Sequence, residues 1–325
     1  MRLSNRVNRV VCVAAVLGAC LAAGNAAAQD SANADAVKHL SSTYVADGDT
    51  WLRGNIHTHS TESDGSLPPQ EVVNYYAKLG YDFLMISDHE KLTPVAGLDG
   101  KGMTLIPGSE ISAKGQHLLH VGANTHVLPD PDRQKVLDLI KQDGGIAVMN
   151  HPNWQASYNH CSLEVLNTLQ GYTGIEIFNG VVVYLDGSEL ATDKWDRLLA
   201  KGRRIYGFAT DDCHNPEQHA GMGWVMVQSK SRAVDDIVNA MRDGRFYAST
   251  GVAFEMIKVD GLTVTVRAAN AQRFRVCADN GKVLKMADGP DLQYTVKPGK
   301  GLTYIRIEGY GPGEQTAWLQ PMFIE

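Results

Sequence analysis

Short apolar runs alternate with amphipathic stretches from about residue 51 to residue 247, and this repetition constrains the fold more than any other feature of the chain. The runs have the length and apolar density of strands that are buried on both faces. Seven candidate strands follow from this pattern: 55–58, 83–87, 104–107, 146–150, 175–178, 205–209 and 224–227. Four helical patterns end at a glycine suited to a left-handed cap: Gly80, Gly144, Gly202 and Gly244. These repeated units predict a closed or nearly closed α/β barrel.

The pattern changes after Thr250. Residues 262–266 and 303–307 alternate apolar and polar side chains, and Asp260-Gly261 favours a tight turn. We therefore predict a barrel over residues 50–250 and a small antiparallel β domain over residues 251–325. This second domain could complete the core, which is the simpler interpretation, or it could recruit a polymer surface.

The first 28 residues have the three parts of a secretory signal: basic residues, an apolar run over residues 10–23, and small residues ending at Ala28. Cleavage after Ala28 would give a secreted or periplasmic protein with residues 29–49 as a polar spacer. Alternatively, the sequence up to Cys20 resembles a lipoprotein processing box, which would leave this cysteine lipidated. No later segment reaches the roughly 20 apolar residues that a membrane-spanning helix needs.

The balance of charge narrows the choice of partner. The 325 residues carry a formal net charge of −6, whereas a broad nucleic-acid-binding face needs a surplus of Lys and Arg. A small molecule is therefore the expected partner, and extended nucleic acid is not. Three cysteines lie beyond the signal, at positions 161, 213 and 277, and this odd, widely spaced set is a poor disulfide framework that leaves at most one pair.

Histidines and carboxylates gather at the carboxyl ends of the predicted strands. In a parallel barrel these ends converge on one face. The residues concerned are His57, His59, Asp64, His89, Glu110, His151, Asp212 and His214. So many unpaired polar groups in one pocket are costly unless cations hold them. Nitrogen and oxygen donors without cysteine suit Zn²⁺, Mn²⁺ or Fe²⁺ better than Ca²⁺ or a soft metal.

Local geometry supports individual members of this set. His57 and His59 are one residue apart on an extended segment, so both point to the same side and can bind one ion. Glu110 offers two oxygens and can bridge two cations. Asp64 could be only a turn residue, and its interpretation as a ligand depends on its neighbours. Cys213 should point away from the metals and act as a small packing residue.

In this order the motifs resemble the PHP family, the polymerase and histidinol phosphatase superfamily of metal-dependent phosphoesterases. The resemblance covers residues 51 to 247 and rests on His-x-His with Ser-Asp-Gly, Ser-Asp-His, Gly-x-Glu, Gly-x-His, His-Pro and Asp-x-His. It implies a distorted (β/α)7 TIM-like barrel that binds two or three divalent metal ions. It also implies three ligand sets: His57, His59, Glu110 and Asp212; Glu110, His151 and a histidine near 117; Asp64, His89 and His214.

Some positions leave a choice within this resemblance. The segment from Gly115 to His120 offers two histidines, of which His117 matches the motif and His120 is the alternative. Asp211 stands where the family more often has Ser, and we expect it to support a ligand. Glu176 could line the site without binding metal or be purely structural. Three histidines match no metal motif, and only the last could touch substrate: His126, His160 and His219.

These features predict a hydrolase in which metal-activated water cleaves a small phosphate monoester or diester. The expected catalytic residues are His59, Asp212 and His214, and an Asp or His at a strand end could protonate the leaving oxygen. Two alternatives stay open. Related barrels hydrolyse amides or carboxyl esters, and an exported protein could bind its ligand in a metal-dependent way without turnover. A full ligand set with room for water favours catalysis.

Overall fold

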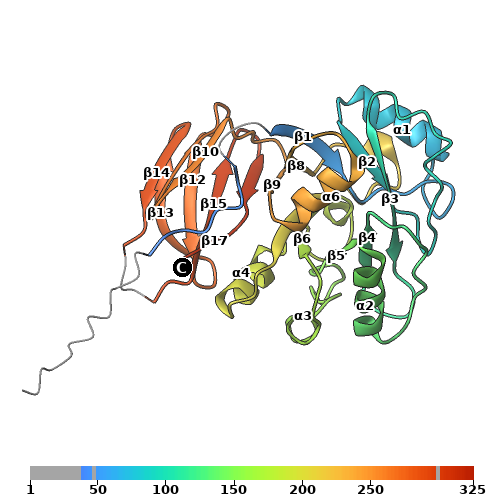
Figure 1. The fold of residues 1–325 in the computed structure, drawn as a ribbon, viewed down its shortest axis with the longest axis horizontal. Coiled ribbons are helices and arrows are strands. Elements are labelled where there is room, and N and C mark those ends of the chain that lie inside the picture. Colours follow the sequence, from blue (N-terminus) through green and yellow to red (C-terminus); the bar gives the residue numbers. More distant parts are fainter. Residues whose placement is uncertain (1–37, 46–48, 298–300) are drawn as a thin grey trace, which may run out of the picture. The chain divides into compact units, whose positions relative to one another are not determined.

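The computed structural model describes residues 38–45, 49–297 and 301–325, which belong to one compact unit (Figure 1). The predicted signal over residues 1–28, the alternative at Cys20 and the first part of the spacer lie outside the described residues. Within the described part of the chain, no helix has both the length and the apolar character needed to cross a membrane.

A mixed sheet forms the framework of the site. Eight neighbouring strands follow one another across it: β8 (Trp224–Ser229), β1 (Thr50–Asn55), β2 (Phe83–Ile86), β3 (Thr104–Ile111), β4 (Leu118–Val121), β5 (Ile146–Met149), β6 (Gly174–Asn179) and β7 (Tyr206–Thr210). The pairs within β1–β2–β3 and within β5–β6–β7 are parallel, whereas β4 and β8 run antiparallel to their neighbours. The prediction of an α/β fold rich in parallel strands is therefore confirmed.

The closed (β/α)7 barrel is not observed in the described residues. Strand β8 pairs antiparallel with β1 and occupies the edge that closure by β7 would need. The segments that follow β1 and β7 meet at an isolated bridge between Thr58 and Cys213, where the His59 amide donates to the Cys213 carbonyl at 2.8 Å. Strand β4, absent from the seven expected strands, follows β3 after only residues 112–117. A connection this short does not allow a parallel crossover, so β4 runs antiparallel.

Helices accompany the sheet in the order expected from the pattern. Their bounds are α1 (Pro69–Lys78), α2 (Arg133–Asp143), α3 (Leu163–Thr168), α4 (Thr192–Ala200), α5 (Pro216–His219) and α6 (Val234–Arg242), with a 3-10 turn η1 (Val181–Tyr184). Helix α2 shows why the sequence specifies these ends. The Asp132 side chain accepts from the amides of Gln134 and Lys135, and Gly144 caps the other end with φ of 88°.

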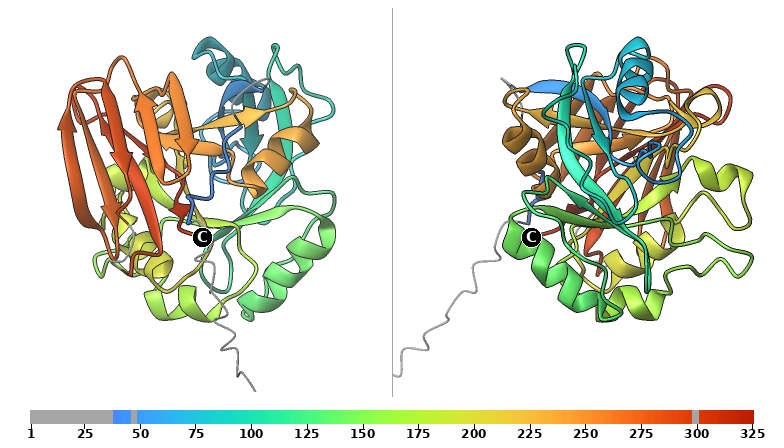
Figure 2. Two further views of the ribbon diagram at one scale, coloured as in Figure 1. Left: turned by 60° about the vertical axis from the view of Figure 1, so that its left-hand side comes forward. Right: turned by 90° about the vertical axis from the view of Figure 1, so that its right-hand side faces the viewer.

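The C-terminal region is an antiparallel β module, as predicted, and its strands are coloured orange to red in Figures 1 and 2. The large sheet continues into it through β9 (Phe246–Ser249), β16 (Thr316–Leu319), β15 (Tyr304–Tyr310), β12 (Arg273–Ala278) and β13 (Lys282–Asp288), with β17 (Met322–Phe323) beside β15. A second sheet contains β10 (Met256–Asp260), β11 (Thr263–Arg267) and β14 (Asp291–Thr295). Buried side chains of both sheets share one apolar core. The domain boundary near residue 250 stays a prediction.

Part of the predicted spacer packs against this module. Leu40 is buried and forms a bridge with Ile324. The Tyr44 hydroxyl donates to the Phe246 carbonyl at 2.9 Å and accepts from the Gln320 amide at 2.9 Å. Residues 38–45 are therefore fixed to the core by apolar and polar contacts that the polar composition of the segment did not suggest.

The three cysteines beyond the predicted signal are buried and free. Cys213 packs in the apolar cluster that contains Val72, Tyr76 and Leu84, which agrees with its expected packing role. Burial raises the pKa of the Cys161 thiol to about 12. The disulfide pair that the sequence left open does not form among these residues.

Candidate metal centre

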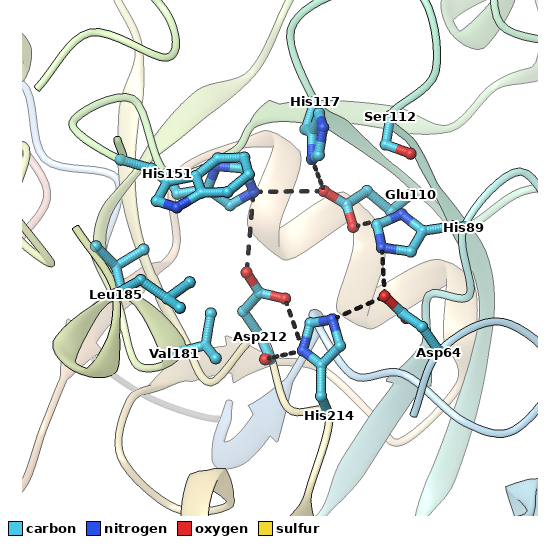
Figure 3. A pocket seen from close by; sticks show the side chains of 12 residues that line it. Asp64, His89, Glu110, Ser112, His117, His151, Val181, Leu185, Asp212 and His214 are labelled. Carbon is cyan, nitrogen blue, oxygen red and sulfur yellow. Dashed lines mark hydrogen bonds and ion pairs between the residues drawn. The ribbon is translucent and has the colours of Figure 1, made fainter. Parts of the chain in front are cut away.

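The nine side chains predicted as metal ligands lie together at one end of the sheet, beside a cavity of about 480 Å³ whose lining side chains are drawn in Figure 3. Each comes from a strand end or from the loop beside it: His57 and His59 after β1, His89 after β2, Glu110 in β3, His117 before β4, His151 after β5, Asp212 and His214 after β7, and Asp64 in the loop that precedes α1. Seven of them line the cavity, while His57 and His59 are fully buried beneath it.

Glu110 occupies the middle of this arrangement. Its side chain is 1% exposed, and its Oε2 atom lies 3.1–3.4 Å from an imidazole nitrogen of each of three residues: His57, His59 and His89. Its Oε1 atom lies 3.0 Å from His117 Nδ1 and 3.5 Å from His151 Nε2. The two oxygens thus face two different sets of histidines, as a carboxylate that bridges two cations would.

Asp212 faces the same two sets from the opposite side of the centre. Its Oδ1 atom lies 3.1 Å from His57 Nε2 and 3.2 Å from His59 Nε2. Its Oδ2 atom lies 3.8 Å from His151 Nε2. The side chains of Glu110 and Asp212 therefore enclose the space between these histidines.

A third group stands nearer the solvent. Asp64 Oδ2 lies 3.5 Å from His89 Nε2 and 3.4 Å from His214 Nε2, and Oδ1 lies 3.7 Å from His59 Nδ1. The Asp64 side chain is 53% exposed, so substrate and water can reach this group. The turn residue of Ser63-Asp64-Gly65 is thus placed among potential ligands, which the sequence pattern alone left open.

The donor atoms present fit divalent cations. Metal–nitrogen and metal–oxygen bonds of about 2.0–2.2 Å place neighbouring donors roughly 3.0–3.4 Å apart, close to the separations around Glu110. Within the centre, Nδ1 of His59, His89 and His151 has no hydrogen-bond partner among the described residues; outside it, both ring nitrogens of His120 also lack one. Buried polar atoms normally have a hydrogen-bond partner, so the unpaired ring nitrogens of the centre favour a ligand there. The assignment of each residue to a particular ion stays a prediction.

Electrostatics within the protein keep the carboxylates ionised. Burial opposes the charged form of Glu110, but the neighbouring imidazoles, with His57 first among them, outweigh it and hold the pKa of Glu110 well below its ordinary value. The same balance lowers the pKa of Asp212. Burial alone would lower the pKa of His214, but hydrogen bonding to Asp64 and the charge of Asp212 raise it to about 9. The carboxylates of Glu110 and Asp212 therefore offer negative charge to a cation.

Two of the central residues have strained backbones. His151 has φ of 28° and Asp212 has φ of 52°, values that side chains with a Cβ rarely adopt. Such conformations cost on the order of 1–3 kcal/mol each and persist where surrounding structure enforces them. Here each turn directs its side chain toward Glu110 or the histidines around it.

Glu176 fixes the direction of the first histidine. Its Oε1 lies 2.6 Å from His57 Nδ1 and accepts from the Thr210 hydroxyl at 2.6 Å, and its Oε2 accepts from the His151 amide at 2.7 Å. His57 therefore presents Nε2 to the centre, in the way that outer carboxylates commonly orient metal-binding histidines. Glu176 stands behind His57 and does not line the cavity.

Sequence reasoning missed several residues that hold the predicted ligands. Asn150 Nδ2 donates to Glu110 Oε1 at 2.8 Å, and Asn179 Nδ2 donates to Asp212 Oδ2 at 3.2 Å. His160 accepts from the His117 amide at 3.1 Å through Nε2, and burial lowers its pKa to about 3. Both asparagines stand at strand ends beside predicted ligands, and this position was the available signal. His160 lies in a loop without a motif.

The expectation for Asp211 was wrong. Its carboxylate accepts from the Tyr76 hydroxyl at 2.7 Å and from the amides of three consecutive residues: Gly221, Met222 and Gly223. Burial raises the pKa of Asp211 to about 6. Asp211 therefore holds the turn before β8 and does not support a metal ligand. His219 accepts from the His214 amide at 3.2 Å and lies outside the cavity lining.

The choice between the two histidines of the Gly115–His120 segment is clear in the structure. His117 lies against Glu110, whereas His120 Nε2 lies 3.2 Å from Asp143 Oδ2. Residues three apart on an extended segment point to opposite faces, which explains why only His117 can face the centre. His120 belongs to none of the three groups of potential ligands.

The burial of His120 gives a prediction for acid stability. Burial lowers its pKa from 6.5 to about 4, and its side chain is 0% exposed. The unfolded chain therefore binds a proton below about pH 6.5 that the folded protein takes up only near pH 4, so stability is lost as the pH falls through this window. When the pH falls from 7 to 4.5, the free energy of unfolding should decrease in both proteins. We expect this decrease to be roughly 1–3 kcal/mol smaller in His120→Gln than in the unsubstituted protein.

Urea unfolding at both pH values measures this difference. The control is His126→Gln, because His126 is exposed in the loop between β4 and α2. Equal acid sensitivity of His120→Gln and the unsubstituted protein would contradict the assignment.

Comparison with known proteins shows that the chain shares its fold with a solved structure. No family model matches the chain. It is 33% identical over 81 residues to the 5'-3' exoribonuclease Rnm of Escherichia coli, which is 22% of this chain and 28% of that protein, so less than a third of the relative is spanned. An amidohydrolase from Chromobacterium violaceum, with bound sulfate and no metal, matches 51% of this chain and 89% of its own at a TM-score of 0.39 and 16% identity.

A more extensive match is the crystal structure of a two-domain protein from Bacteroides vulgatus. That protein contains a predicted PHP-like metal-dependent phosphoesterase. The match covers 82% of this chain and 92% of that one, with a TM-score of 0.51 and 21% identity. At this identity the likeness shows the fold, and it agrees with the resemblance seen in the motifs. The chain thus has the fold of a two-domain protein with a PHP-like domain.

Proposed function

We propose that the chain is a metal-dependent phosphoesterase that hydrolyses a small phosphate monoester or diester. The observation that carries this proposal is the placement of Glu110, whose two oxygens face separate sets of histidines in a buried centre beside an open cavity. Phosphoryl transfer requires mainly positioning and neutralisation of charge, and a pair of bridged cations supplies both. The fold shared with the PHP-like protein agrees with this chemistry.

The residues would hold two or three divalent ions, with Zn²⁺, Mn²⁺ or Fe²⁺ as the proposed metals because the donors are imidazoles and carboxylates. When bound, such ions lower the pKa of water toward neutrality and neutralise phosphoryl oxygens. Glu110 and Asp212 would hold these ions through their carboxylate oxygens. Glu176 would hold His57 in the orientation that the centre needs.

The three predicted catalytic residues differ in access. The side chain of His59 is 0% exposed, that of Asp212 is 6% exposed, and that of His214 is 28% exposed. His59 does not line the cavity, so it could act only from beneath it, by holding an ion. Asp212 and His214 both line the cavity, and His214 is the more exposed of the two to a substrate.

The cavity favours a small ester over nucleic acid. Neither Lys nor Arg lines it among the described residues, and the whole chain carries a net charge of −6. A track for an extended polyanion needs cationic side chains, so a single small substrate is the better fit. We also propose export to the periplasm or the medium, on the signal-like pattern that ends at Ala28, with lipidation at Cys20 as the alternative.

Removal of metal is expected to abolish turnover. Treatment with a chelator should stop release of inorganic phosphate, and adding back Zn²⁺, Mn²⁺ or Fe²⁺ one at a time should restore it. His59→Ala should reduce turnover by on the order of 100-fold or more, because loss of a group around a metal commonly costs this much in affinity or activity. The melting temperature should show that the substituted protein is still folded.

The assay should compare phosphate monoesters and diesters with amides and carboxyl esters, using exposed His126→Ala as the control. Full turnover in His59→Ala would refute the centre. Hydrolysis confined to amides or carboxyl esters would replace the proposed reaction. Metal-dependent binding of a phosphate ester without hydrolysis would instead identify a binding protein.

A further inference from the structure

One wall of the cavity is apolar. Trp154, Val181, Val182 and Leu185 line it opposite the polar side chains. Figure 3 shows Val181 and Leu185 on the side of Asp212 that faces away from Asp64 and His89. The Trp154 ring lies with its centre 5.1 Å from that of His151 and 5.7 Å from that of His117. Any group that rests on this wall is therefore close to the candidate metal centre.

The wall comes from two loops that are tied together. Trp154 forms a bridge with Gly187, and the Gln155 amide donates to the Asp186 carbonyl at 2.8 Å. Beneath them, the buried Lys194 ammonium donates at 2.7 Å to each of two carbonyls at the ends of the first loop, those of Pro152 and Cys161. These bonds hold the wall in place without a ligand, so a substrate would not have to order it.

The second loop is also anchored beside the centre. The amide of Gly180 donates to the Thr210 carbonyl and that of Val181 to the Asp211 carbonyl, both at 2.9 Å. Val181 and Val182 are consequently buried, whereas Leu185 stays 48% exposed. Leu185 thus leaves apolar surface free at the edge of the cavity, and apolar lining with a few polar groups is characteristic of ligand sites.

We propose that this wall selects phosphate esters whose alcohol carries a compact apolar group of about the size of a phenyl ring. The inference rests on the proposed function, because it takes the phosphoryl group to lie at the metal centre. A cavity of about 480 Å³ has room for one phosphoryl group and one ring-sized substituent. The lack of Lys and Arg among its lining residues leaves a second phosphate without a partner. Leu185 and Trp154 are then specificity residues for the leaving group.

The first test compares benzyl phosphate with ethyl phosphate, because both release an ordinary alcohol and differ mainly in apolar size. We expect the metal-loaded protein to show kcat/KM for benzyl phosphate about tenfold or more above that for ethyl phosphate. In Leu185→Ser and in Trp154→Ala this ratio should fall by about tenfold. The matched control is Val183→Ser, since Val183 is 49% exposed on the same loop and does not line the cavity.

A binding measurement separates this inference from the proposed reaction. Calorimetry of the metal-loaded protein with benzylphosphonate and methylphosphonate should show about tenfold tighter binding of the benzyl compound, and Leu185→Ser should remove the preference. Hydrolysis of both esters at equal rates, with equal binding of both phosphonates, would contradict the proposed selectivity of the apolar wall and would still support the proposed phosphoesterase reaction. A benzyl preference in binding without any hydrolysis would support the wall and overturn the reaction. Absence of both hydrolysis and binding would overturn both.

Discussion

Glu110→Gln is expected to lower kcat/KM for the ester by on the order of 1,000-fold and to reduce the metal content of the purified protein. Loss of an outer residue commonly costs 10–100-fold in metal affinity or activity, and a shared inner ligand should cost more. The substitution keeps the size of the side chain but replaces one oxygen with an NH₂ group. The Glu110 carboxylate faces one set of histidines with Oε1 and the other set with Oε2. The glutamine side chain has a single oxygen, so it can serve only one of the two sets.

Elemental analysis and steady-state kinetics on the same preparation measure this result. Glu164→Gln is the matched control, because Glu164 is exposed on α3 and carries the same change of charge. Circular dichroism should show that both variants retain the fold. Unchanged metal content and unchanged kinetics in Glu110→Gln would show that Glu110 bridges no ions.

The largest effect on stability is expected at Arg306, on β15 in the C-terminal module. Its side chain is 3% exposed and lies between two buried carboxylates: Nη2 is 2.6 Å from Asp196 Oδ2, and Nη1 is 2.5 Å from Glu308 Oε1. Removing one partner of a buried ionic group leaves uncompensated charge and costs about 3–5 kcal/mol. We expect Arg306→Met to lose this much free energy of unfolding. Asp196 lies on α4, so the ion pair also links the module to the helices around the site.

Urea unfolding at neutral pH measures the loss. Arg267→Met is the control, because Arg267 pairs with Asp291 on the surface, where it is 46% exposed and such pairs contribute at most about 1 kcal/mol. Adding Asp196→Asn and Glu308→Gln to Arg306→Met should restore part of the stability by removing the stranded charges. A loss below that of the control would show that the three groups are not coupled.

The convergence of the site could be predicted because it depends on a local rule. A residue that follows a parallel strand lies at one edge of the sheet, whatever its distance along the sequence. This rule predicts that His57, His89 and Asp212 lie together, whether or not the sheet closes into a barrel. It holds here although the sheet does not close as a barrel, since the carboxyl ends of β1, β2 and β7 still meet.

The strand order could not be predicted, because it depends on connections and pairings between distant segments. The six residues before β4 force an antiparallel return, and the pairing of β8 with β1 takes the edge that β7 would have used. The same limit applies to the outer residues of the site. Asn150, Asn179 and Asp211 are polar residues at strand ends, and only their hydrogen-bond partners distinguish a support for a ligand from a support for a turn.

The left-handed backbones of His151 and Asp212 have an evolutionary consequence. Glycine would adopt φ of 28° or 52° without steric conflict, so selection for folding alone would favour it at both positions. A related chain that held no ion at the proposed centre would be expected to replace these two side chains and to gain thermal resistance in doing so. Retention of histidine and aspartate at these two turns can therefore serve as a marker of chains in which the proposed centre is still used.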